Sequence, residues 1–96
     1  MISEERQFML TAAWLFVWHG RSERARVIME AMQEENPRDG VAAAALAELL
    51  LASGEAERAL RVIRSADFPV ELSRAEAVLE SRALSMLGRE QESERR

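Results

Sequence analysis

The chain has 96 residues, a formal net charge of −4, and only four Gly and two Pro in a composition rich in Ala, Leu, Glu and Arg. This length is that of one domain, and the excess of strong helix formers predicts an all-α fold. The absence of Cys excludes disulfides, thiolate metal sites and thiol nucleophiles, and Arg residues interleaved with Glu do not suggest a nucleic-acid partner.

The N-terminal segment from Phe8 to Trp18 is apolar except for Thr11. A surface helix normally keeps a polar face, so a helix without one must be covered by its own chain or by another. The segment is shorter than the roughly 20 residues of a membrane span, and the preceding Glu4 and Glu5 have the wrong charge for a signal peptide. We therefore expect a cytoplasmic protein without membrane insertion, whose first helix needs cover.

Helix signals divide the chain into five segments. Ser3 is a plausible N-cap of the first helix, and the residue before Pro37 is biased away from helical backbone. The expected helices run from about Ser3 to about His19, from after Ser22 to just before Asn36, from Val41 to Ala52, from about Ala56 to near Asp67, and from about Ser73 to Leu87.

The glycines that close the odd-numbered helices, Gly20, Gly54 and Gly88, are spaced by 34 residues. A helix-turn-helix unit with this period is typical of tetratricopeptide repeats (TPR). The blocks GRSERA and GEAERA, which begin at Gly20 and Gly54, also match each other. The TPR pattern falls on Met9, Ala12, Ala13, Phe16, Ala25, Met29 and Pro37 in the first repeat, and on Ala43, Leu46, Ala47, Leu50, Ala59 and Ile63 in the second.

The third repeat is degenerate, because Glu80 stands where the pattern has Leu and a second helix is missing or short. The sequence thus predicts an all-α, TPR-like helical repeat array of about two and a half repeats with five main helices. We expect a single domain over 1–96, with repeat 1 at about 6–39, repeat 2 at about 40–73, and repeat 3 at about 74–96, which includes a charged C-terminal tail at 89–96.

The first helix of each TPR lines the concave surface of the array, where ligands lie. In this register the concave positions are Leu10, Trp14, Val17 and Trp18, then Val41, Ala44, Ala45, Glu48 and Leu51, and finally Val78, Leu79, Arg82 and Met86. Because the set is mostly apolar and its only basic residue is Arg82, it fits a carboxylate-binding groove poorly. It instead suits the apolar face of an amphipathic helix.

Trp14 and Trp18 lie one helical turn apart and could belong either to the core or to the groove. The inward positions of the first helix are already taken by other residues, so we expect at least one Trp to face a partner or a second copy. His19, the only His, is interpreted as a residue at the helix end, where it complements the dipole. The sequence has no glycine-rich phosphate loop, metal-ligand spacing or enclosed acid–base pair, so we expect no enzyme activity, metal or cofactor.

The block LLLASGEAERALRVIRSADFP, followed by an Ala/Leu helix ending in LSMLG, resembles the TPR-like chaperones of bacterial type III secretion needle subunits over about residues 8–88. The resemblance implies that the groove holds the amphipathic C-terminal helix of a needle subunit and prevents premature polymerisation. It also implies that a small helical co-chaperone packs on the N-terminal part. By position, Leu10, Trp14, Val17, Trp18, Val41, Ala45, Leu51, Val78, Leu79 and Met86 would line the needle-helix groove.

Two other interpretations stay open. The chain could be a generic TPR-like adaptor, or the apolar first helix could pack against a second copy and form a homo-oligomeric scaffold. Exposed apolar surface of this size also predicts self-association of the isolated chain.

Overall fold

Five α-helices and one short 3-10 helix make up the chain in our computed structural model, which describes residues 3–94, without the side chains of residues 3, 5, 8, 16 and 90–94. The elements are α1 (Ser3–Trp18), α2 (Ser22–Glu35), α3 (Gly40–Ala52), α4 (Ala56–Ser65), η1 (Val70–Leu72) and α5 (Ser73–Glu94). The predicted all-α fold is confirmed.

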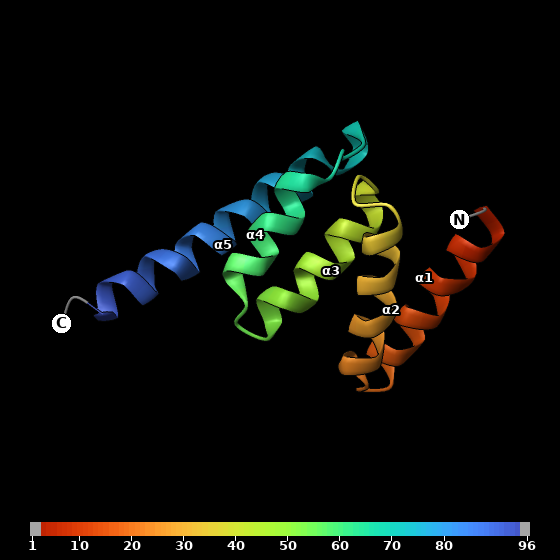
Figure 1. Cartoon of the computed structure of the whole chain (residues 1–96). Helices are drawn as coiled ribbons and strands as arrows, with labels where there is room; N and C mark the ends of the chain where they lie inside the picture. The colour runs from red at the N-terminus through yellow and green to blue at the C-terminus, as the bar shows by residue number, and fades with distance from the viewer. Residues whose placement is uncertain (1–2, 95–96) are drawn as a thin grey trace.

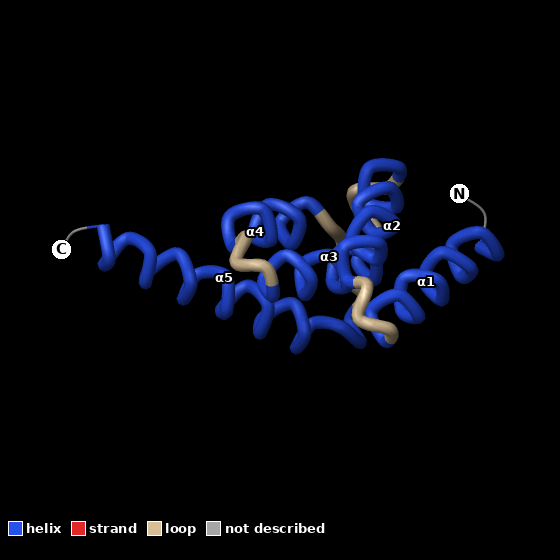
Figure 2. Tube along the Cα trace, turned by 90° about the horizontal axis from the view of Figure 1, so that it is seen from below, coloured by secondary structure: helices blue, strands red, loops and turns tan. Residues whose placement is uncertain are grey.

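The helices form two layers. Consecutive helices pack on each other, and α3 also packs against α5. Viewed from below, α1, α3 and α5 lie on one side of the molecule and α2 and α4 lie on the other (Figure 2). The result is an elongated array of 50 × 30 × 20 Å in which two helical hairpins are followed by the single helix α5 (Figure 1).

The two hairpins turn at equivalent glycines. Gly20 and Gly54 have φ angles of +74° and +80°, a left-handed conformation that Gly adopts without the steric cost of a Cβ atom. The next helix starts two residues after each glycine, at Ser22 and at Ala56. The matching sequence blocks at these sites therefore encode the same turn twice.

Gly88 does not end a helix, so the prediction that α5 stops at Leu87 is wrong. The helix continues through Gly88 to Glu94. The sequence after Gly20 and Gly54 supplies Ala25 and Ala59 to pack against the preceding helix, whereas the equivalent residue after Gly88 is Ser93, in a charged segment. Without an apolar face that could fold back, this segment of good helix formers extends α5 instead.

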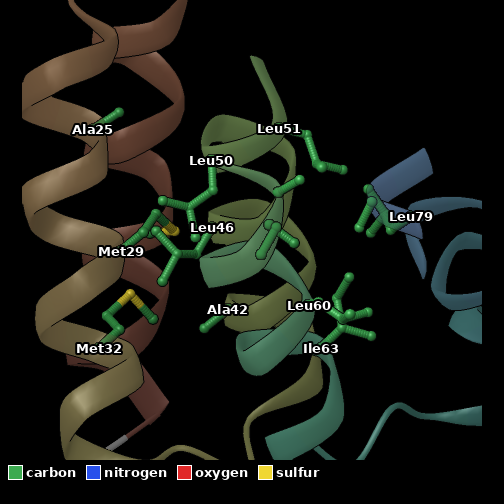
Figure 3. Packing of buried hydrophobic residues seen from close by; sticks show 14 of the residues in the cluster. Ala25, Met29, Met32, Ala42, Leu46, Leu50, Leu51, Leu60, Ile63 and Leu79 are labelled. Atoms are coloured by element: carbon green, nitrogen blue, oxygen red, sulfur yellow. The ribbon is translucent and has the colours of Figure 1, made fainter. Parts of the chain in front are cut away.

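The core lies between the two layers. Ala25, Met29 and Met32 of α2 point towards Leu46 and Leu50 of α3 (Figure 3). All six residues of the TPR pattern in the second repeat, Ala43, Leu46, Ala47, Leu50, Ala59 and Ile63, are at most 1% exposed. Small residues at these positions let the paired helices approach closely, and the large residues fill the remaining space.

Helix α5 is the last of the described helices and has a more polar face than α3. Ala77, Ser81 and Leu84 follow Ala43, Ala47 and Leu50 by 34 residues, but they are exposed because no helix folds back onto α5. Glu80 occupies a Leu position of the pattern, and its Oε1 lies 3.7 Å from Nη2 of Arg64 on α4. This face of α5 is thus more polar than the equivalent face of α3.

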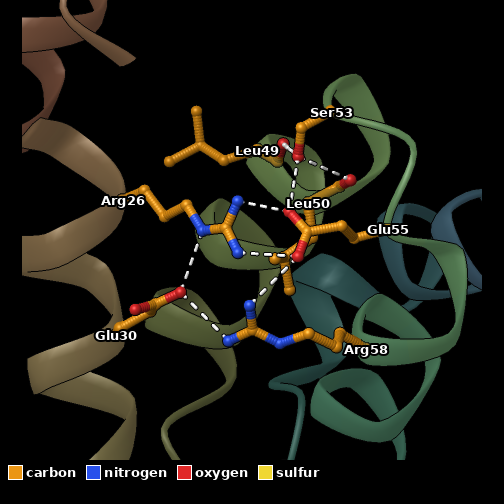
Figure 4. Close-up of polar contacts among 7 residues, drawn as sticks. All are labelled: Arg26, Glu30, Leu49, Leu50, Ser53, Glu55 and Arg58. Carbon is orange, nitrogen blue, oxygen red and sulfur yellow. Dashed lines mark hydrogen bonds and ion pairs between the residues drawn. The ribbon is translucent and has the colours of Figure 1, made fainter. Parts of the chain in front are cut away.

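A charged network joins α2 to the start of α4 (Figure 4). Arg26 donates to Glu30 at 2.9 Å and binds both carboxylate oxygens of Glu55. Arg58 donates to Glu30 at 3.0 Å and to Glu55 at 3.1 Å, and the Ser53 hydroxyl donates to Glu55 at 2.9 Å. Hydrogen bonds from Arg26, Ser53 and Arg58 lower the pKa of Glu55 to about 2.

Candidate functional site: an apolar groove

Three rows of side chains, one each from α1, α3 and α5, line a groove on the α1–α3–α5 side of the molecule. Helical spacing of four and seven residues places Leu10, Trp14 and Val17 on one face of α1, and Val41, Ala45 and Glu48 on one face of α3. We use the term groove for the two adjoining hollows that these three rows line.

The first hollow lies between α1 and α3 and has a volume of about 410 Å³. Its lining is apolar apart from Glu48. The lining residues are Leu10, Ala13, Trp14, Val17, Ala25, Met29, Val41, Ala45, Glu48 and Leu49.

The second hollow lies between α3 and α5 and has a volume of about 580 Å³. It is lined by Ala44, Ala45, Glu48, Arg74, Ala75, Val78 and Leu79. Ala45 and Glu48 border both hollows, which makes the groove continuous from α1 to α5. The small side chains of α3 at its centre leave room for a large occupant to approach the backbone.

Trp14 and Trp18 form a stacked pair on α1. Their ring centroids are 5.4 Å apart and the ring planes differ by 19°. The two residues are 60% and 72% exposed, so neither belongs to the core of the described structure. Trp14 borders the first hollow, whereas Trp18 is outside its lining and stacks against Trp14.

The ten residues predicted for the groove fall into two groups. Leu10, Trp14, Val17, Val41, Ala45 and Val78 line the hollows with accessible side chains. The other four, Trp18, Leu51, Leu79 and Met86, are buried, half-buried or outside the lining of the hollows.

Leu51 and Leu79 are both buried, and only the groove prediction for Leu51 is corrected, because it lines neither hollow. They are 4% and 5% exposed, because α5 packs against α3 at this place. Only Leu79 touches the groove, as part of the floor of the second hollow. Met86 is half-buried, packs against the core and is not part of the lining of either hollow.

The charged lining residues of the groove are Glu48 of α3 and Arg74 of α5. Glu48 accepts from Arg82 Nη1 at 3.0 and 3.2 Å, which joins α3 to α5 across the groove. Arg74, on the first turn of α5, borders the second hollow and was missed in the sequence analysis. The 34-residue register could have identified it, because Arg74 lies one turn before Val78 on the same helix face.

The opposite side of α1 is uncovered by the described residues. A further hollow, separate from the groove, is lined by Ala12, Leu15, His19 and Arg21. Leu15 is 46% exposed there. Within residues 3–94, α1 packs chiefly against α2, and the side with Leu15 is left accessible.

Two kinds of feature are missing from residues 3–94. No group of three His, Cys, Asp or Glu side chains is arranged to hold a metal ion. None of the helices has the length and apolar character needed to cross a membrane.

Helical hairpins stacked in two layers define a helical-repeat protein. A family model described as tetratricopeptide repeat matches residues 9–69. The chain belongs to the tetratricopeptide repeat family, whose members use this fold to bind other proteins. Comparisons with curated proteins and with solved structures gave no significant match.

Proposed function

We propose that the protein is a chaperone whose groove binds the apolar face of an amphipathic helix. The observation that carries this proposal is the mostly apolar lining from Leu10 to Val78, interrupted by Glu48, which includes Trp14 of the exposed Trp pair. An exposed hydrophobic patch with polar surroundings is typical of a protein-binding site. An amphipathic helix would bury Trp14 and place its own large side chains in the two hollows.

The energetics favour Trp14 as the main anchor. Burying a large apolar side chain contributes about 1.5–3 kcal/mol, and Trp is among the residue types most often found at interface hot spots. Stacking on Trp18 restrains the Trp14 ring before binding, so less side-chain entropy is lost on association.

We further propose a needle subunit of a type III secretion system as the partner that supplies the helix. The support is the sequence resemblance over about residues 8–88 and a groove that suits an aggregation-prone amphipathic helix. The uncovered side of α1 at Leu15 gives a separate surface for the small helical co-chaperone that the resemblance implies. With both partners bound, α1 would be covered on its remaining sides.

The test is titration of the purified protein with a helical peptide from the C-terminus of a candidate needle subunit. The protein has two Trp and no Tyr, so its emission reports on the Trp pair alone. We expect a red-shifted spectrum that moves to shorter wavelength as the peptide binds. An unchanged spectrum, with no heat of binding by calorimetry, would contradict a groove for this helix.

Variants locate the binding surface. Trp14→Ala should weaken binding by roughly 2 kcal/mol or more. Val27→Ala is the matched control, because Val27 is 66% exposed on α2 and lies outside the groove lining. Wild-type affinity of Trp14→Ala would remove the groove from the proposed function.

A homo-oligomeric scaffold is the second candidate function. It is favoured by the exposure of Trp14, Leu15, Val17 and Trp18 on several sides of α1. Sedimentation of the isolated protein separates the two candidates: a stable dimer that does not bind the peptide supports the scaffold, and a species that takes up the peptide supports the chaperone.

A further inference from the structure

Arg74 differs from the other charged residues at the groove. Glu48 is paired with Arg82. Arg74, in contrast, has no carboxylate within ion-pair distance among the described residues. Its side chain is exposed at a hollow whose other lining residues are apolar except for Glu48.

Helix α5 therefore gives one end of the groove a positive charge. Arg74, Val78 and Arg82 follow one another at intervals of four residues and so share a face of the helix. Glu48 neutralises Arg82 through one guanidinium nitrogen, Nη1. The lining residues that α1 contributes are uncharged, and Arg74 of α5 is the basic residue in the lining of the second hollow. Beyond the paired Glu48 of α3, the groove therefore changes from apolar at α1 to basic at α5.

A helix that fills both hollows would cover Arg74 and remove water from its guanidinium group. A charge that loses its water without gaining a partner opposes binding, whereas a carboxylate offers charge-assisted hydrogen bonds that are about twice as strong as neutral ones. An apolar or basic residue of the occupant at this position would therefore bind less well than an acidic one.

We infer that Arg74 selects an occupant helix with an acidic side chain at the end of its apolar face, where that face meets α5. The inference rests on the proposed function, because it assigns a chemistry to the helix held in the same groove. It makes Arg74 a specificity-determining residue, while Leu10, Trp14 and Val17 provide contacts that do not depend on charge.

The probe is a set of designed helical peptides of about 16 residues, long enough to have measurable helicity. Each peptide has an Ala-based helix with Leu at positions i, i+3, i+4 and i+7. One further position, next to the Leu row at either the N-terminal or the C-terminal end, is Glu, Gln or Arg. Calorimetry gives the Kd of each peptide for wild type, for Arg74→Glu and for Arg89→Glu.

Only one end of the bound peptide meets α5. Among the peptides with the variable residue at that end, we expect wild type to bind the Glu peptide roughly tenfold more tightly than the Arg peptide, with the Gln peptide between them. Arg74→Glu should reverse this order. Arg89→Glu makes the same charge change on an exposed residue of α5 outside the groove lining and should leave the order unchanged. The preference should shrink in about 1 M salt, where the Debye length is about 3 Å.

The outcomes separate the inference from the proposed function. If all peptides bind and the charged position changes nothing, Arg74 does not select the occupant and the inference is overturned while the groove remains. If Arg74→Glu and Arg89→Glu shift the Kd values equally, the effect is one of net charge and the inference fails. If none of the peptides binds wild type, the proposed function fails and the inference fails with it.

Discussion

Arg6 of α1 forms a two-point ion pair with Asp39, the residue that caps α3. Arg6 Nε and Nη2 donate to Asp39 Oδ2 and Oδ1 at 2.7 and 3.0 Å. Asp39 Oδ1 also accepts from the backbone N–H groups of Val41 and Ala42 at 3.1 and 3.2 Å. The hydrogen bond from Arg6 lowers the pKa of Asp39, although burial opposes the shift. One carboxylate thus joins the start of α1 to the start of α3.

This double role predicts unequal effects of substitutions at the two residues. Asp39→Ala removes a helix cap and the ion pair, and we expect it to lower the free energy of unfolding by about 1–2 kcal/mol. Arg6→Ala removes only the ion pair and should cost about 0.5 kcal/mol. Urea unfolding followed by circular dichroism measures both, and Asp39→Asn should fall near Arg6→Ala because Asn also caps helices. Equal losses in the Arg6→Ala and Asp39→Ala variants would show that the cap contributes nothing.

Gly40 and Gly88 should respond in opposite directions to Ala. A Cβ atom at Gly40 would lie 2.5 Å from the Asp67 carbonyl oxygen and 2.7 Å from Phe68 Cα, both backbone atoms. We expect Gly40→Ala to cost about 1–3 kcal/mol. At Gly88 a Cβ meets nothing within 4 Å, so Gly88→Ala should stabilise α5 by about 0.5–1 kcal/mol. Thermal unfolding of the two variants beside wild type checks the prediction, and a stabilised Gly40→Ala protein would contradict the close contact of this turn with residues 67–69.

Leu51 on α3 and Val78 on α5 should differ in their contribution to stability. Leu51 is 4% exposed and Val78 is 51% exposed. Leu51→Ala leaves a cavity and should cost about 2–4 kcal/mol. Val78→Ala should change the free energy of unfolding by less than about 0.5 kcal/mol. Denaturant unfolding tests the pair, and a destabilised Val78→Ala protein would place Val78 in the core rather than on the groove.

The network around Glu55 predicts a loss of stability in acid. Its pKa falls from an ordinary value of 4.5 to about 2 in the folded protein, chiefly through hydrogen bonds from Arg26 and Ser53. Because the unfolded chain binds this proton more tightly, the contribution of ionised Glu55 is complete above pH 4.5 and is lost as the pH falls towards 2. The difference in unfolding free energy between wild type and Glu55→Gln should therefore narrow over this range.

The control for this acid effect is Glu57→Gln on the same helix. Glu57 has a side chain that is 78% exposed and is paired with Arg61 at 3.5 Å. We expect Glu57→Gln to follow the wild-type pH profile in denaturant titrations between pH 6 and 2. A Glu55→Gln profile parallel to wild type throughout would mean that the network does not stabilise the folded state.

The sequence predicted the hairpins well because local signals determine them. Gly20, Gly54 and Pro37 mark the ends of helices, and the repeated block of six residues encodes one turn twice. Gly88 was misinterpreted because its spacing was taken to indicate a turn, as at Gly20 and Gly54. A turn at those two glycines is stabilised by the apolar helix that follows and packs back, and the residues after Gly88 have no such apolar face.

The groove was predicted in outline and missed in detail for a different reason. The register of one repeat identifies the concave face of each first helix, which is how Trp14 and Val41 were found. It does not show how closely the next repeat packs, and this packing buries Leu51 and Leu79. The pairing of Arg26 with Glu55, 29 residues apart, was also beyond the pattern, because Glu and Arg alternate along both helices.

Helix α3 lies at the centre of the array and is, of the described helices, the one with the most α-helical neighbours packed against it. This helix packs against α2, α4 and α5, and seven of its thirteen residues are buried. Amide protons of α3 should therefore exchange with solvent only when the whole chain unfolds, while those of α1 and of the last turns of α5 exchange through local fraying. The groove thus has its most slowly exchanging backbone along its floor and more easily opened backbone at its edges, so an occupant would slow exchange most at the edges.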